Sequence, residues 1–238
     1  MLKIAVCCCT YNRPHLLGEL IHSFEIQDYP KSHCELVVLD DAGQYGDLYG
    51  ENWQVVSFPR RFASLGEKRN ACVSLTSHEC EYFVVADDDD IYFSWWLQCH
   101  AANFERGALW SFAGAAYWAH NNVIRKKWKY SSDSFLMHPA HGFSKKVFWG
   151  SGGYLHYAGW EDRFLFKKLS DTGIEHRDAL EGNCRPYMIY RRFDTERHTT
   201  EMPVGQYRKQ PERLPAVKLE IGWKQDYSGL VQKFEENT

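Results

Sequence analysis

No run of apolar residues in this 238-residue chain approaches the length of about 18 residues that a membrane-spanning helix requires. The opening Met-Leu-Lys-Ile-Ala-Val also lacks the longer apolar stretch of a secretory signal peptide. The eight cysteines contain no Cys-x-x-Cys spacing, and three of them, at positions 7–9, lie within an apolar segment. We therefore expect a cytoplasmic protein that has no membrane span and keeps its thiols reduced and packed.

A large excess of one charge is also missing. The net charge of −3 argues against a surface that grips nucleic acid or anionic membrane as a whole, although a local basic groove is compatible with it. Contents of 44% hydrophobic and 25% charged residues are ordinary for a soluble globular protein, and the length suits one sizeable core. Aromatic residues are abundant, at 16% with nine Trp. Such residues line sugar or base sites, or they fill a core.

Short apolar runs alternate with helix-like stretches in the N-terminal part of the chain. The runs, which lack polar alternation and therefore predict strands covered on both faces, are residues 4–9, 35–39, 54–58 and 82–86. Pro14 opens a stripe of apolar residues with helical period, and residues 64–67, Ser-Leu-Gly-Glu, have the form of a capping box. The order predicts an α/β fold with a mostly parallel sheet.

The second half is less regular. We predict an apolar segment at residues 109–119, a basic turn at 125–129 and a strand at 143–148. A glycine-rich loop then leads into a helix that starts near Trp160 and stops near Gly173. The tail after residue 202 is polar and contains three prolines.

Four consecutive aspartates, Asp87, Asp88, Asp89 and Asp90, directly follow an apolar run. Carboxylates this close repel one another, which raises their pKa values, unless a divalent cation or a positive partner neutralises them. Hard oxygen ligands favour Mg²⁺ or Mn²⁺ over zinc. The run therefore predicts a metal site, with a solvated acidic turn as the alternative.

Polar clusters follow each of the four predicted strands, at residues 10–13, 40–41, 60–61 and 87–90. Ligands of parallel α/β sheets bind beyond the carboxyl ends of the strands, so a single crevice would collect these clusters. A divalent ion beside basic and hydroxyl groups suits a diphosphate, which points to a nucleotide-linked substrate.

Several side chains in this crevice have two interpretations. Arg13, Lys68 and Arg69 are either contacts for phosphate or base, or surface cations. Asp40 or Asp41 either accepts a hydrogen bond from the imide N–H of uracil, or starts a turn before a glycine.

Three residues later in the chain are candidates for chemistry. Glu161 and Asp162 stand where the glycine-rich loop meets a helix, so that one is a general base for an acceptor hydroxyl, or both stabilise the helix dipole. His198 is either a metal ligand or a surface or packing residue.

Five motifs, taken in order, resemble family 2 glycosyltransferases of the GT-A fold, in the nucleotide-diphospho-sugar transferase superfamily. They are Thr-Tyr-Asn-Arg at residues 10–13, Val-Leu-Asp-Asp at 38–41, Gly-Glu-Lys-Arg-Asn-Ala at 66–71, the aspartate run with Ile-Tyr at 87–92, and Trp-Glu-Asp at 160–162. The resemblance covers roughly residues 3–170. It implies a Rossmann-like central sheet flanked by helices, with a small C-terminal acceptor lobe. We expect one domain over residues 1–238, with a nucleotide-binding half (1–97), an acceptor and catalytic half (98–202) and a C-terminal extension (203–238).

The resemblance also implies roles by position. The residues it assigns to the donor nucleotide are Thr10, Tyr11, Arg13, Asp40 or Asp41, Lys68, Asp87 and Asp88. The Asp-x-Asp motif maps to Asp87 and Asp89, with Asp89 as the preferred ligand of Mn²⁺ or Mg²⁺, and a shifted register would use Asp88 and Asp90. His198 is the second metal candidate. Glu161 and Asp162 are the catalytic candidates, with Asp162 as the base of an inverting transfer and Trp160 beside the acceptor or sugar.

The expected function is a metal-dependent hexosyl- or pentosyltransferase that moves a sugar from a nucleotide-diphosphate donor, such as a UDP-sugar, to an acceptor hydroxyl. The Gln-x-x-Arg-Trp motif of processive synthases is absent, which favours a non-processive enzyme. The acceptor stays open among a glycan, a lipid-linked sugar, a protein, a small molecule and a hydroxylated base in DNA. A set of basic residues either suits the last of these acceptors or forms an ordinary solvated face. The set consists of Arg125, Lys126, Lys127, Lys129, Arg191 and Arg192.

Three further expectations follow. Because the chain is short for the family, a partner or a second protomer would complete the acceptor lobe. A nucleotidyltransferase is one alternative, although residues 10–15 lack the glycines of a phosphate loop. A non-catalytic nucleotide-sugar-binding scaffold is the other.

Overall fold

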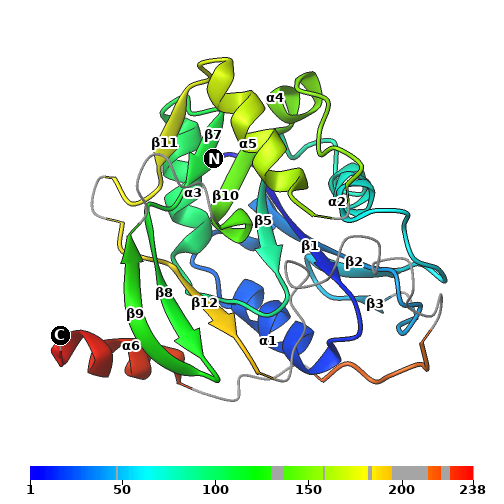
Figure 1. The fold of residues 1–238 in the computed structure, drawn as a ribbon, viewed down its shortest axis with the longest axis horizontal. Helices are drawn as coiled ribbons and strands as arrows, with labels where there is room; N and C mark the ends of the chain where they lie inside the picture. Colours follow the sequence, from blue (N-terminus) through cyan, green and yellow to red (C-terminus); the bar gives the residue numbers. More distant parts are fainter. Residues whose placement is uncertain are drawn as a thin grey trace.

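A computed structural model describes residues 1–46, 48–129, 137–157, 159–181, 184–194, 214–220 and 226–237. Within these ranges the chain forms two sheets (Figure 1). The larger sheet has the strand order β11-β7-β10-β5-β1-β2-β4-β3, and the smaller one has the order β6-β12-β8-β9. None of the helices in the described ranges is both long enough and apolar enough to cross a bilayer.

The larger sheet is built around four parallel strands, as the sequence predicts. Its strands are β1 (Ile4–Thr10), β2 (Cys34–Asp40), β3 (Leu48–Tyr49), β4 (Trp53–Ser57), β5 (Tyr82–Asp87), β7 (Trp110–Phe112), β10 (His141–Ser144) and β11 (His176–Asp178). β1 lies between β2 and β5 and pairs in parallel with both, and β4 continues the parallel set beyond β2. β3 and β10 pair antiparallel to their neighbours in this set. The carboxyl ends of β1, β2, β4 and β5 therefore meet at one edge.

Helices cover both faces of this sheet. They are α1 (Pro14–Glu25), α2 (Leu65–Ser74), α3 (Trp96–Glu105), α4 (Lys145–Gly150) and α5 (Glu161–Asp171), and two short 3-10 turns lie at Lys31–His33 and His138–Ala140. Alternate residues of β1 enter two different core clusters, one packed with α1 and α3, the other with α2, α4 and α5. The expected burial of the strands on both faces is confirmed.

Both predicted helix starts are confirmed. Pro14 occupies the first turn of α1. Ser64 caps α2, because its hydroxyl accepts a hydrogen bond of 3.1 Å from the backbone N–H of Glu67. The Glu67 carboxylate reaches back to the N–H of Ala63 at 3.0 Å, one residue earlier than in an ideal capping box.

The predictions for the second half are partly wrong. The basic segment at 125–129 is not a turn: it belongs to β9 (Val123–Lys129), which pairs antiparallel with β8 (Ala115–His120). The turn lies earlier, at Asn121 and Asn122, whose φ angles of 47° and 61° suit a two-residue hairpin loop. The strand predicted at 143–148 also ends early, since β10 stops at residue 144 and α4 follows. The apolar residues Val147 and Phe148 pack against the core from a helix, and a short apolar segment does not distinguish a helix from a strand.

The smaller sheet and a C-terminal helix form a second layer (Figure 1). Its other strands are β6 (Ile91–Tyr92) and β12 (Met188–Arg192), and the helix is α6 (Tyr227–Glu236). The sequence reading assigned no helix to the polar tail. α6 forms because one face, including Tyr227, packs with Ile91, Tyr117 and Ile189 in a separate core cluster. The short apolar face of this helix becomes evident only beside the sheet that it covers.

Three histidines are buried in the main core, and this makes stability dependent on pH. Burial lowers the pKa of His100 from its usual 6.5 to about 3, and the pKa values of His138 and His141 are also well below their usual range for the same reason. The unfolded chain therefore binds more protons than the folded one below pH 6.5. The folded state loses stability as the pH falls from 6.5 toward 3.

We expect His100→Gln to remove part of this dependence. The linkage relation gives His100 a contribution of about 2 kcal/mol to the stability lost between pH 7 and pH 5. Urea denaturation of the wild type and the variant at both pH values measures the difference. His156→Gln, at an exposed position, is the control and should follow the wild type. Equal pH slopes for all three proteins would contradict the assignment.

Candidate active site

Three of the four aspartates gather at the end of β5. Asp87 is the last residue of that strand, and the next three residues form a turn into β6. Carboxylate oxygens of Asp87, Asp89 and Asp90 lie within 4.8 Å of one another. Asp88 points elsewhere: it accepts hydrogen bonds from the Thr10 hydroxyl at 2.6 Å and from Arg13 at 2.9 Å. The geometry thus separates the run into a cluster of three and one residue that fixes the loop after β1.

The electrostatics of the cluster favour a cation. Burial, opposed by Arg69 and reinforced by Asp89, raises the pKa of Asp87 to about 7. Burial and the neighbouring carboxylates also raise the pKa of Asp90 well above its usual range. One oxygen of Asp90, Oδ2, is buried and has no hydrogen-bond partner. An all-oxygen donor set with an unsatisfied buried oxygen fits a hard divalent cation such as Mg²⁺ or Mn²⁺.

Arg13 partly compensates the negative charge. Its guanidinium, at the start of α1, lies 2.9 Å from oxygens of both Asp88 and Asp89. Thr10 and Arg13, which the sequence assigns to the donor nucleotide, therefore contact the aspartate run itself. Thr10 and Asp88 are 78 residues apart in sequence, and the parallel pairing of β1 with β5 brings the two strand ends together.

Asp40 organises the loop after β2. Its two carboxylate oxygens accept hydrogen bonds from the backbone N–H groups of Ala42 and Gln44, at 2.9 and 3.1 Å, and from the Ser57 hydroxyl at 2.7 Å. The carboxylate is fully buried. The turn that the sequence allows at this position is therefore present, with Gly43 at a φ of 66°.

Asp41 is the centre of a buried ion cluster. Lys68 lies 2.5 Å and Arg61 2.8 Å from its Oδ1 oxygen, and Lys68 also donates to the carbonyl of Thr10 at 2.6 Å. Lys68 is thus not a surface cation. The Arg61 guanidinium in turn lies 3.6 Å from the ring centre of Tyr11, so that the loops after β1, β2 and β4 are joined.

The glycine-rich loop delivers Glu161 and Asp162 to the same region. Trp160, directly before α5, has a φ of 70°, which is a strained conformation for a bulky residue. Glu161 is buried and ion-paired with Arg69, whose other nitrogen lies 3.8 Å from Asp87. Burial, opposed by Arg69, raises the pKa of Glu161. Arg69 therefore bridges the aspartate cluster and the first turn of α5.

Asp162 and Trp160 face more open space than Glu161 does. Asp162 is half-buried, and its carboxylate accepts a hydrogen bond of 2.8 Å from the backbone N–H of Arg163. Trp160 is 63% exposed, and Arg163 lies 4.1 Å over its ring. The loop is held close to α2, because a Cβ on Gly66 would lie 1.9 Å from the carbonyl oxygen of Leu155. The glycine permits this close approach.

Arg191 is a residue of this region that the sequence reading placed wrongly. The sequence predicts a surface cation at this position, suited to an anionic acceptor, but the Arg191 side chain is only 1% exposed. It donates to the Asp89 carbonyl at 2.5 Å and to Glu19 at 2.7 Å, and its backbone N–H donates to the Asp90 carboxylate at 2.9 Å. A contact of 2.9 Å to the Tyr227 hydroxyl extends the network to α6. No local signal distinguishes this arginine from its neighbour Arg192.

The structure thus brings together, at one edge of the sheet, most of the predicted site residues. Those within this connected set are Thr10, Tyr11, Arg13, Asp41, Lys68, Asp87, Asp88, Asp89 and Glu161, with Asp162 and Trp160 adjoining Glu161. Asp40 lies next to them in the loop after β2. His198 lies outside the described residues.

A mostly parallel α/β sheet flanked by helices, with an aspartate cluster after β5 and a carboxylate pair opening α5, is the arrangement expected of the GT-A fold. The family model of Glycosyl transferase family 2 matches residues 5–169, and the chain belongs to that family. Over 97 residues it is 33% identical to the poly(ribitol-phosphate) beta-N-acetylglucosaminyltransferase TarS of Staphylococcus aureus. This match covers 38% of the chain but only 17% of that relative.

Two solved structures share the fold. The structure of S. aureus TarS 1–349 in complex with UDP-GlcNAc has a TM-score of 0.65 at 17% identity, with 85% of this chain and 62% of that chain covered. The mannosyltransferase PcManGT from Pyrobaculum calidifontis, in complex with GDP-Man and Mn²⁺, has a TM-score of 0.57 at 14% identity, with 79% and 56% covered. The predicted family and fold class are confirmed.

Proposed function

We propose that this protein is a metal-dependent glycosyltransferase that moves a sugar from a nucleotide-diphosphate donor to an acceptor hydroxyl. The observation that carries the proposal is the bridge through Arg69. It joins the cluster of Asp87, Asp89 and Asp90 to Glu161, the residue before Asp162. One edge of the sheet therefore carries both a cation site for a departing diphosphate and a carboxylate for an attacking hydroxyl.

The donor would lie across the carboxyl ends of β1, β2, β4 and β5. The nucleotide would contact the loops that contain Tyr11 and Asp41, and the diphosphate would lie at the aspartates. Asp87, Asp89 and Asp90 would hold Mn²⁺ or Mg²⁺, which would neutralise charge on the departing diphosphate. The complexes of TarS with UDP-GlcNAc and of PcManGT with GDP-Man and Mn²⁺ support this choice of donor and ion. We favour a UDP-sugar.

Asp162 is the proposed general base. Its carboxylate is more open than that of Glu161, so it can reach an acceptor hydroxyl and take the proton as the hydroxyl oxygen attacks the anomeric carbon. A single displacement of this kind inverts the configuration at that carbon. Glu161, held by Arg69, would orient the first turn of α5, and the exposed Trp160 would flank the acceptor.

A neutral glycan or small molecule is the favoured acceptor, and the transfer would be non-processive. A DNA acceptor is less favoured, because the buried Arg191 cannot contact a phosphate backbone together with the other basic residues. We also propose that a partner or second protomer completes the acceptor lobe and that His198 is a metal ligand. The proposed location is the cytoplasm.

Thermal unfolding with nucleotides tests the donor site. We expect UDP with Mn²⁺ or Mg²⁺ to raise the melting temperature, because a ligand of the native state stabilises it, and EDTA to remove most of that rise. GDP, ADP, TDP and CMP serve as comparisons. Asp89→Asn should lose the metal-dependent part of the shift. An equal shift with EDTA would contradict the metal role, and binding without any transfer to an acceptor or to water would favour the scaffold alternative.

A further inference from the structure

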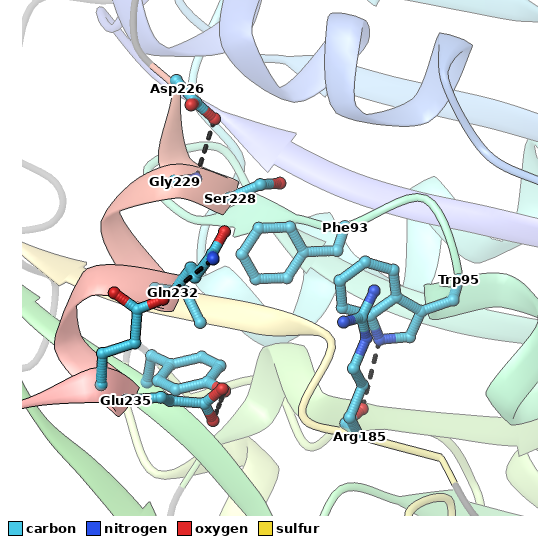
Figure 2. Close-up of a pocket in the computed structure, with 11 residues that line it drawn as sticks. Phe93, Trp95, Arg185, Asp226, Ser228, Gly229, Gln232 and Glu235 are labelled. Carbon is cyan, nitrogen blue, oxygen red and sulfur yellow. Dashed lines mark hydrogen bonds between the residues drawn. The ribbon is translucent and has the colours of Figure 1, made fainter. Parts of the chain in front are cut away.

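A cavity of about 590 Å³ lies between α6 and the smaller sheet (Figure 2). It is separate from the aspartate cluster. Two lining residues show this. Phe93 directly follows β6, and Asp90 directly precedes that strand. Arg185 lies before the start of β12, and Arg191 lies near the end of that strand. Because β6 and β12 are antiparallel, Phe93 and Arg185 lie at the same end of this strand pair. The aspartates lie at the opposite end. Its volume is in the range of small-ligand pockets.

One wall of the cavity is aromatic and carries a cation. The rings of Phe93 and Trp95 are stacked, with centres 4.8 Å apart and an angle of 8° between their planes. The Arg185 guanidinium lies 3.7 Å from the centre of the Trp95 ring, and the indole N–H donates to the Arg185 carbonyl at 3.2 Å (Figure 2). Within the described ranges no carboxylate forms a salt bridge with Arg185. Its N–H groups are therefore positioned by the indole and open to a ligand.

The opposite wall is the polar side of α6. Gln232 donates to Glu236 at 2.9 Å, which leaves the Gln232 carbonyl oxygen and a second Glu236 oxygen as acceptors. Val231 adds an apolar contact. Glu235 is already engaged by the Tyr117 hydroxyl at 2.5 Å. The cavity thus offers donors on one side, acceptors on the other and apolar surface between them.

This combination selects the chemistry of the ligand. One guanidinium faces three carboxylates, Asp226, Glu235 and Glu236, so an anion is disfavoured. A cation gains little, because Arg185 already lies over the indole of Trp95 and each carboxylate already has a partner. The Gly229 N–H donates to Asp226, Tyr117 and Lys127 contact Glu235, and Gln232 donates to Glu236. A purely apolar ligand would bury polar groups without partners. A neutral molecule with many hydroxyls and an apolar ring face satisfies both walls.

We propose that this cavity binds a neutral saccharide, at a site distinct from the donor cleft. The site needs neither a metal ion nor a nucleotide. If the protein is a glycosyltransferase, as proposed above, such a site would hold a glycan away from the position of transfer. Acceptors long enough to reach both places would then bind more tightly than short ones.

Calorimetry and saturation-transfer NMR test the site directly. The probes are unsubstituted di- and tetrasaccharides of glucose, N-acetylglucosamine, mannose and galactose, added in EDTA without nucleotide. We expect at least one to bind, and Arg185→Ala and Gln232→Ala to weaken its binding about tenfold each, because each removes a hydrogen-bonding partner. Lys233→Ala, on α6 but outside the cavity lining, is the matched control and should bind like the wild type.

The outcomes are distinguishable from those of the proposed function. Gln232 is exposed, so its variant should keep the fold, and thermal unfolding checks this for every variant. Failure of all probes to bind would overturn the saccharide site. Binding that is unchanged in both cavity variants but lost on addition of UDP and Mn²⁺ would also overturn it, since the saccharide would then occupy the donor cleft. Neither result depends on whether sugar transfer occurs.

Discussion

Replacing Asp162 by Asn should lower the rate of sugar transfer by about 10²- to 10⁴-fold, the usual contribution of a general base. Asn has nearly the same shape as Asp, but it cannot accept the proton of the acceptor hydroxyl. The substitution leaves the Arg69 bridge to Glu161 in place, so the first turn of α5 should keep its position. Transfer assayed with a UDP-sugar and a saturating acceptor measures the effect.

Two controls isolate the base from other roles of α5. Asp171→Asn, at the far end of the same helix and paired with Lys167 on the surface, should transfer sugar like the wild type. The Asp162 variant should also retain the thermal shift with UDP and Mn²⁺, because the donor site is intact. Wild-type transfer by Asp162→Asn would remove Asp162 from the mechanism. Loss of the thermal shift would show instead that the substitution disturbs the donor cleft.

Replacing Arg191 by Met should reduce the free energy of unfolding by about 3–5 kcal/mol, the cost of breaking a buried ion pair by removing one partner. Met preserves the approximate length of the side chain but donates no hydrogen bond. The Glu19 carboxylate, the Tyr227 hydroxyl and the Asp89 carbonyl would all lose their donor. The backbone hydrogen bond from residue 191 to Asp90 would remain.

Chemical denaturation measures this loss, with Arg192→Met as the matched control. Arg192 is the next residue and is half-buried, so its substitution should cost less than about 1 kcal/mol. Adding Glu19→Leu to Arg191→Met should restore part of the stability, because the carboxylate left without its partner is removed. A loss below about 1 kcal/mol for Arg191→Met would show that the network does not hold α1, β12 and α6 together.

The parallel half of the fold is predictable from sequence, because its signals are local. The apolar runs became β1, β2, β4 and β5 within a residue or so, and Ser64 caps α2 as expected. The predictions failed where local patterns are ambiguous. Basic residues at 125–129 suit an exposed strand as well as a turn, and the apolar residues Val147 and Phe148 suit a short helix as well as a strand.

The sequence by itself determined the family, the parallel sheet and the edge at which the site lies, because periodicity and strand-end residues are properties of short segments. Only the tertiary structure decided how the aspartates divide their roles, since Asp88 turns to Thr10 and Arg13 while its three neighbours form a cluster. It also decided the burial of Arg191, whose partner Asp90 is 101 residues away in sequence. Such contacts depend on which strands become neighbours, and no local pattern of residues encodes that distance.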